Sequence, residues 1–351
     1  MLRYVQTPIK CLQAILICLG LSSASGFAQD IHFGHLAAVP TQTNPAYTGL
    51  MEAKARIGVD YRGQWNHITN AFRTTSVSAD AKLWENRYDV LGGGLQLTSD
   101  KAGDLSFTTA QVGATTSYLK ALDNGQTYLA FGLQGVYNFQ SIDWGAAEAF
   151  DFEPLEIYGS DGRLSFWDVG AGLSFFRRPS RSISWFAGVA GAHLNRPQVT
   201  FVNDADGNLA DRLYTKVTFH AGGEFKFGRF NSIRPSILYL KQHQHRQLKV
   251  GTFYRFKADR GIATDSDVAV HFGVFVRAYP AQDNAGVDAI ILAVRFDYNL
   301  TIITASFDTN VSQLSEISYG AGGPEFSIIQ QFSWGSSRRQ RHKVKCPTFQ
   351  Y

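Results

Sequence analysis

Residues Lys216 to Phe227, which read KVTFHAGGEFKF, decide the fold because they alternate between two kinds of side chain. Apolar side chains share one face, at Val217, Phe219, Ala221, Phe225 and Phe227. The opposite face carries Lys216, Thr218, His220, Glu224 and Lys226. A period of two residues is that of a β-strand whose faces meet different surroundings. This stretch therefore predicts a strand with one apolar and one largely ionic face.

The same alternation recurs along the chain, most clearly in residues 128–140, 167–175 and 288–298. About fourteen such segments can be recognised, an even number that is usual for bacterial outer-membrane barrels. They are centred near residues 60, 78, 95, 112, 133, 171, 188, 221, 237, 250, 272, 292, 305 and 329. Periodicity alone does not tell which face points inward, so a soluble β-sandwich stays open as an alternative.

The length of the gaps between these segments depends on whether the gap is odd-numbered or even-numbered along the chain. The long gaps, roughly 141–164, 195–212, 278–286 and 310–322, are the fifth, seventh, eleventh and thirteenth. The even gaps are mostly tight turns, with 257–267 as the exception. Membrane barrels have short periplasmic turns and longer external loops, whereas a sandwich has no reason to sort its loops. The chain is therefore predicted to be all-β, forming a single antiparallel transmembrane β-barrel.

The first 28 residues have the features of a secretory signal peptide. Arg3 and Lys10 are basic, an apolar stretch runs over residues 12–21, and Gly26 and Ala28 suit a cleavage site. After Ala28 no apolar stretch approaches the ~18 residues that indicate a transmembrane helix. We expect a signal peptide (1–28), a periplasmic N-terminal segment (29–54), the barrel (55–334) and a basic periplasmic tail (335–351). The expected location is the cell outer membrane.

Enzymatic chemistry is not indicated, and we expect no catalytic residue, cofactor or metal. Cys346 is the single cysteine after residue 28, and no Gly-x-Ser-x-Gly motif is present. His243 and His245 offer half of a zinc site, and residues 203–208 resemble a calcium loop without its glutamate. Both are better explained as hydrated external turns.

The basic run in residues 338–345 is interpreted as a solvated or protein-docking tail rather than a nucleic-acid site.

Several short motifs go beyond alternation. Between Gln29 and Trp65 they are Asn44-Pro45-Ala46 with Gly49, Tyr61-Arg62 and Gln64-Trp65. Later motifs are HLNRP at 193–197, ASFD at 305–308, VSQL at 311–314, EFS at 325–327 and Cys346-Pro347. In this order they resemble the PorP/SprF family of type IX secretion system membrane proteins of the Bacteroidota.

The resemblance implies an outer-membrane barrel that serves the type IX secretion and gliding apparatus. Its implied partners are periplasmic ring and lipoprotein components, a large secreted adhesin and outer-membrane lipid, with no nucleic acid. The alternative is a general porin or small-solute uptake channel. A porin predicts a wide polar lumen, whereas a scaffold for protein contacts predicts a lumen occluded by side chains or loops.

The motif residues are the candidate docking residues: Asn44, Pro45, Gly49, Arg62, Trp65, Arg196 and Pro197. Each also has a structural interpretation. Asn44 and Pro45 would begin a turn, and Gly49 would permit a left-handed bend before the first strand. Arg62 and Trp65 fit an anchor at the membrane interface. Arg196 and Pro197 fit the end of a strand, because proline cannot donate to the ladder.

Overall fold

The computed structural model describes residues 40–64, 72–86, 88–103, 106–123, 126–142, 162–199, 212–258, 268–279, 286–311 and 322–334. All of them belong to the compact unit Phe33–Tyr351. The expected signal peptide, Trp65 and the basic tail lie outside the described residues.

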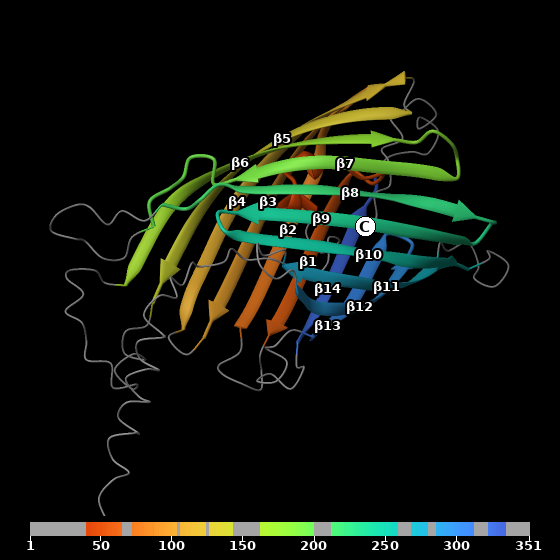
Figure 1. The fold of residues 1–351 in the computed structure, drawn as a ribbon. Helices are drawn as coiled ribbons and strands as arrows, with labels where there is room; N and C mark the ends of the chain where they lie inside the picture. The colour runs from red at the N-terminus through yellow and green to blue at the C-terminus, as the bar shows by residue number, and fades with distance from the viewer. Residues whose placement is uncertain are drawn as a thin grey trace, which may run out of the picture. The chain divides into compact units, whose positions relative to one another are not determined.

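Fourteen antiparallel strands form one closed barrel (Figure 1). They are β1 (Ala55–Gln64), β2 (Phe72–Glu85), β3 (Asp89–Ala102), β4 (Phe107–Leu122), β5 (Thr127–Ser141), β6 (Arg163–Arg177), β7 (Ile183–Ala192), β8 (Lys216–Phe227), β9 (Asn231–Gln242), β10 (His245–Lys257), β11 (Val268–Tyr279), β12 (Gly286–Tyr298), β13 (Thr301–Asn310) and β14 (Gly323–Phe332). β1 closes the ring against β14, from Ala55↔Phe332 to Arg62↔Glu325. The predicted fold class is confirmed.

The two faces of the sheet differ as the alternation predicted. In β12, Leu292 and Val294 are 57% and 48% exposed, whereas Arg295 and Asp297 are buried. The apolar side chains therefore point outward and the ionic ones point into the lumen. A sandwich would have the reverse arrangement, while a barrel in lipid requires this one. Within the described residues, no helix is long and apolar enough to cross a membrane.

The connections are sorted between the two ends of the barrel, as predicted. The long ones, β5–β6, β7–β8, β11–β12 and β13–β14, all leave from one end. At the other end, residues 228–230 and 299–300 form tight turns, and 258–267 is the longer exception. Outer-membrane barrels place short turns in the periplasm and long loops outside. We therefore name the two ends periplasmic and external.

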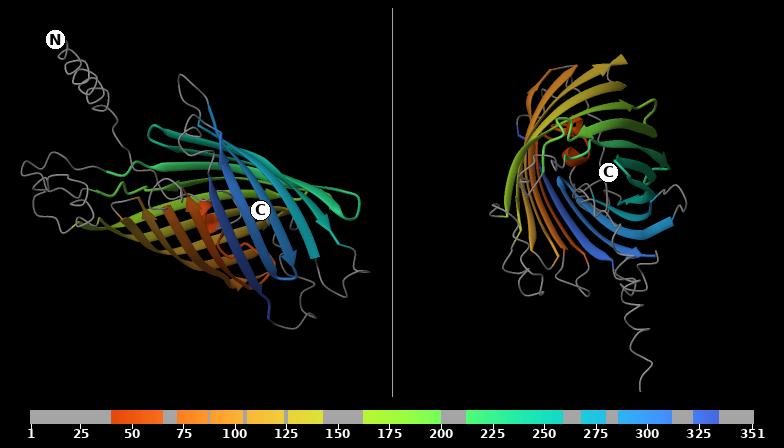
Figure 2. Two further views of the ribbon diagram at one scale, coloured as in Figure 1. Left: turned by 90° about the horizontal axis from the view of Figure 1, so that it is seen from below. Right: turned by 60° about the vertical axis from the view of Figure 1, so that its left-hand side comes forward.

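The chain before β1 folds inside the barrel. Helix α2 (Pro40–Thr43) is followed by the 3-10 helix η1 (Pro45–Tyr47), which contacts β4, β5 and β6. Figure 2 shows this red segment within the ring of strands. We call residues 40–53 the plug segment. Of the segment 29–54, which we expect to be periplasmic, the plug segment lies in the lumen, where its side chains find partners on the inner wall.

Candidate functional site

Asn44 both starts the helix of the plug segment and attaches it to the wall. Its backbone is extended, and its side-chain oxygen accepts a hydrogen bond from Ala46 N at 2.9 Å. Pro45 suits the first helical position, where an N–H would have no helical partner. The Asn44 side-chain Nδ2 donates to Leu173 O and to Ser174 Oγ of β6, both at 3.0 Å. The turn expected at Asn44 and Pro45 is therefore present, and it is docked in the lumen.

Glycines in the wall let the plug segment approach the strand backbone closely. A Cβ atom added to Gly132 of β5 would overlap Ala46 N, and one added to Gly92 of β3 would overlap Thr48 O. Any side chain at these positions would push the segment away from the wall. Gly92 and Gly132 thus make room for the plug segment.

A buried ion pair holds the end of the plug segment against β1 and β2. Arg56 Nε and Nη2 donate to the two carboxylate oxygens of Asp80, each at 2.8 Å. The same carboxylate accepts a hydrogen bond from Gly49 N at 2.7 Å. Gly49 has a φ of +68°, in the left-handed region that glycine tolerates best. The left-handed bend expected at Gly49 is confirmed, and it leads the chain into β1.

Apolar packing completes the attachment of the plug segment. The ring of Tyr47 lies 5.8 Å from Phe176 and 5.3 Å from His220, measured between centroids. Tyr47 and Leu50 belong to a buried cluster with side chains of β3 to β7. Burying a large apolar side chain stabilises a fold by about 1.5–3 kcal/mol. The plug segment is thus held by packing as well as by polar contacts.

Charged side chains meet in the lumen near the external end. We call them the outer cluster: Arg62, Lys249, Arg277, Asp288, Asp308 and Glu325. Asp308 Oδ2 lies 3.1 Å from Arg62 Nη2 and 3.0 Å from Arg277 Nη1. Arg277 Nε lies 2.7 Å from Asp288 Oδ2. The cluster thus brings buried cations and carboxylates together, as buried charges require. Because the members come from β1 and β10 to β14, the cluster joins strands that are distant in the sequence.

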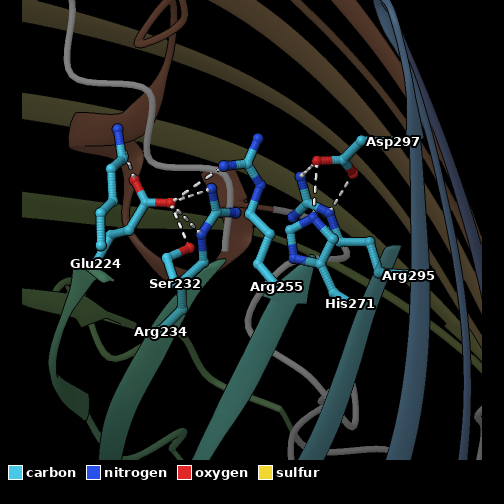
Figure 3. Close-up of polar contacts among 8 residues, drawn as sticks. Glu224, Ser232, Arg234, Arg255, His271, Arg295 and Asp297 are labelled. Atoms are coloured by element: carbon cyan, nitrogen blue, oxygen red, sulfur yellow. Dashed lines mark hydrogen bonds and ion pairs between the residues drawn. The ribbon is translucent and has the colours of Figure 1, made fainter. Parts of the chain in front are cut away.

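A second group lies on β8 to β12 toward the periplasmic end (Figure 3). We call it the arginine cluster: Glu224, Ser232, Arg234, Arg255, His271, Arg295 and Asp297. Glu224 Oε1 accepts hydrogen bonds from Ser232 Oγ and from Arg234 Nη2, both at 2.9 Å, and lies 3.6 Å from Arg255 Nη1. The arginine cluster thus contains three guanidinium groups, of Arg234, Arg255 and Arg295, and two carboxylates, of Glu224 and Asp297.

The other carboxylate of the arginine cluster belongs to Asp297. It accepts a hydrogen bond from Arg295 Nε at 2.7 Å, and its Oδ2 lies 3.0 Å from His271 Nε2. Among the described residues, no group of three or more His, Cys, Asp or Glu side chains is placed to hold a metal. In the arginine cluster the two carboxylates are held by ion pairs and hydrogen bonds.

The candidate docking residues occupy three separate places. Asn44, Pro45 and Gly49 lie in the plug segment. Arg62 is only 2% exposed and lies in the outer cluster, so it does not anchor the barrel at the membrane interface. Even-numbered residues of β1 point into the lumen, which explains this placement. Trp65 lies outside the described residues.

Arg196 and Pro197 follow β7 at the external end, where the chain leaves the sheet. Arg196 is exposed and lies over the ring of Tyr214, with its guanidinium carbon 5.7 Å from the centroid. Pro197 is buried, and its carbonyl accepts a hydrogen bond from Leu213 N at 3.0 Å. These two residues therefore shape the base of the β7–β8 loop, as a strand-end interpretation predicts.

A model of the family described as type IX secretion system membrane protein PorP/SprF matches residues 25–328. The chain belongs to this family. This PorP/SprF protein is thus an outer-membrane barrel of the type IX secretion system, and its family implies interaction with the secretion machinery. Family and fold are those of a secretion-system barrel rather than of a known enzyme class. None of the curated proteins matches the chain.

Solved outer-membrane barrels are similar to the PorP/SprF protein in fold at low sequence identity. The P. putida toluene transporter TodX is 10% identical with a TM-score of 0.46, covering 87% of this chain and 95% of that one. The Ralstonia pickettii toluene transporter TbuX is 10% identical with a TM-score of 0.45, covering 83% and 93%. CdiB from Acinetobacter baumannii is 11% identical with a TM-score of 0.43, and the match covers 80% of this chain and 60% of CdiB.

The sequence did not predict the plug contacts or the two charged clusters of the PorP/SprF protein. Its alternation did place Arg295 and Asp297 on the ionic face of one strand. The pairing of Arg62 with Asp308 has no local signal, because the two residues are far apart in the chain. The sequence offered one indication of ion pairs between strands in the lumen. Near the ends of several strands, charged residues occupy alternate positions and therefore share the inner face.

Proposed function

We propose that this PorP/SprF barrel assists the export or surface attachment of secreted adhesins through protein–protein contacts. The observation that carries the proposal is the occupied lumen. The plug segment packs on the inner wall, and the two charged clusters cross-link the strands of the other side. A general porin or uptake channel needs an open polar lumen, so the occupied lumen favours the scaffold.

The proposed partners are periplasmic ring and lipoprotein components at the periplasmic end and a large adhesin as the exported substrate. In this proposal, residues 1–28 are removed as a signal peptide. Residues 29–39 and the basic tail 335–351 are periplasmic in this proposal. Asn44, Pro45 and Gly49 then act indirectly, by fixing the plug, while the exposed Arg196 is available to a partner at the external end.

Affinity purification of the tagged full chain from detergent-solubilised outer membranes tests the proposal. Periplasmic ring proteins or one large adhesin are expected in the eluate. A tagged outer-membrane barrel of unrelated function, purified in the same way, controls for proteins that bind any barrel. A chain that purifies alone and conducts ions freely in bilayers would instead support the porin alternative.

A genetic readout tests the same proposal independently of detergent. Removing the gene is expected to abolish surface display of the partner adhesin, and the wild-type gene is expected to restore it. Normal display of every secreted adhesin in the absence of the protein contradicts the proposal. Fractionation of cells then tells whether the adhesin accumulates in the periplasm or is released into the medium.

A further inference from the structure

Strand β6 is paired along its whole length with one neighbour and along only part of it with the other. Its pairing with β5 covers all 15 of its residues. Its pairing with β7 starts at Arg177 and stops at Ala171, which lies opposite Gly191. β6 therefore extends farther toward the external end of the barrel than β7 does.

The residues that follow β7 end this pairing. Leu194 N donates to Val169 O at 3.0 Å. The side chain of Asn195 then takes the place of a backbone peptide group, because its Oδ1 accepts from Val169 N at 3.1 Å and its Nδ2 donates to Trp167 O at 2.7 Å. At Arg196 the chain turns away with a φ of +46°.

The backbone of β6 beyond Asn195 forms an open edge. Alternate residues of a strand direct their N–H and C=O groups toward the same neighbour, so Ser165 and Arg163 face the side on which Asn195 binds Trp167. None of the described residues pairs with Ser165, with Arg163 or with the N–H of Trp167 on this side. We call this side of residues 163–167 the β6 edge. It is about 13 Å long, at ~3.3 Å per residue.

Aromatic side chains indicate the level of the β6 edge in the membrane. Trp167 is 64% exposed on the outer face, and its ring centroid lies 4.8 Å from that of Tyr137. Trp and Tyr are enriched where the bilayer meets water. From Trp167 the edge runs outward to the exposed Arg163. Backbone groups are not left open in lipid, whereas at this level water or a polypeptide can reach them.

We propose that the β6 edge binds an extended segment of the exported protein by strand addition. A row of backbone N–H and C=O groups is matched by the backbone of another strand. The edge lies at the external end of the barrel, and the exported protein is the polypeptide that the secretion function brings there. The inference rests on the proposed function and deepens it, because it gives the adhesin a place of contact and a conformation.

The side chains beside the edge indicate which segment fits. Side chains of an added strand lie about 4.5–5.5 Å from those directly opposite them. Near the start of the edge they meet the exposed Trp167 on the outer face and the buried Phe166 on the inner face. Near its end they meet Arg163. The matching segment is apolar or β-branched at its inner end and polar or acidic at its outer end.

Photo-crosslinking in living cells tests the site. The full chain carries Arg163→p-benzoylphenylalanine on the β6 edge. A control carries the same change at Lys101, which is exposed at the external end of a strand that is paired on both sides. Heat-dependent migration on SDS gels first establishes that each barrel is folded. After illumination we expect about tenfold more crosslinked adhesin at position 163 than at 101, because a few net backbone hydrogen bonds favour one position by at least that factor.

Two changes at Ser165 separate the backbone from the side chain. Ser165→Pro removes an N–H from the edge and leaves the pairing with β5, because this N–H faces away from β5. Ser165→Ala removes only the hydroxyl, which accepts a hydrogen bond from Tyr137 Oη at 3.1 Å. With the crosslinker at position 163, Ser165→Pro should lower the yield about tenfold, and Ser165→Ala should leave it unchanged. If Ser165→Pro does not fold, positions 163 and 101 still decide.

Several results overturn the proposal. They are equal yields at positions 163 and 101, equal yields from Ser165→Pro and Ser165→Ala, and capture at 163 of lipopolysaccharide, another part of this chain or a second copy instead of the adhesin. Purification of the wild type separates the edge from the function on which it rests. If the adhesin accompanies the wild type but is not captured at position 163, the edge is refuted and the function stands. If no adhesin accompanies the wild type and none depends on it for surface display, the proposed function itself fails.

Discussion

At the scale of single residues, Asn44 has two roles that one substitution separates. Aspartate caps a helix as well as asparagine does, but it has no amide donor. In Asn44→Asp, a carboxylate oxygen would face Leu173 O and Val189 O, which now accept from the amide at 3.0 and 3.3 Å. We expect a loss of about 1–3 kcal/mol in the free energy of unfolding. Urea unfolding in detergent measures it, and an unchanged midpoint would mean that capping alone matters.

Gly132 offers a second test at this scale, with a control on the same strand. A Cβ at Gly132 would overlap the plug backbone, whereas one at Gly135 meets nothing within 4 Å. Gly132→Ala is therefore expected to destabilise the barrel by about 1–3 kcal/mol, a typical cost of overpacking. Gly135→Ala should leave stability unchanged. The temperature at which each variant loses its folded migration on SDS gels compares them, and equal values would contradict the close approach.

At the scale of elements, the outer cluster joins β1 to β11 and β13, and Asp308 is its shared carboxylate. Asp308→Asn leaves Arg62 and Arg277 without this partner in a buried site. Removing one member of a buried pair typically costs about 3–5 kcal/mol. The double variant R62Q/D308N should cost less than the sum of the single changes, since the groups interact. Denaturant unfolding of all four proteins measures the coupling, and strict additivity would refute it.

The pair of Lys120 and Asp89 is the control for this cycle, because it also joins two strands by an ion pair, at 2.8 Å, but is partly open to solvent. Lys120 is about half exposed, and surface pairs contribute only ~0–1 kcal/mol. Lys120→Gln should therefore change the unfolding free energy much less than Asp308→Asn. A similar cost for both would mean that burial does not set the strength of the outer cluster.

The surroundings of each strand and of the plug segment explain which parts of the fold could be predicted from the sequence. The strands and their loops were predictable because lipid on one side and an ionic lumen on the other impose a period of two on each segment, as in 216–227. The plug segment has no such period, and its main partners, Leu173 and Ser174, lie more than a hundred residues away. The turn at Asn44 and the bend at Gly49 were local and predictable, but their place inside the barrel was not.

At the scale of the whole molecule, the ion conductance of the lumen distinguishes a scaffold from a channel. With the plug segment in place, the wild-type protein is expected to conduct far less in planar bilayers than Gly132→Val, whose larger side chain displaces the segment. Gly135→Val, which points into open space, should behave as the wild type does. Each barrel must first show folded migration on SDS gels. If the wild type conducts as well as Gly132→Val, the plug does not close the lumen, and the molecule works as a porin. If only Gly132→Val conducts, residues 40–53 seal a barrel whose function depends on what binds its ends.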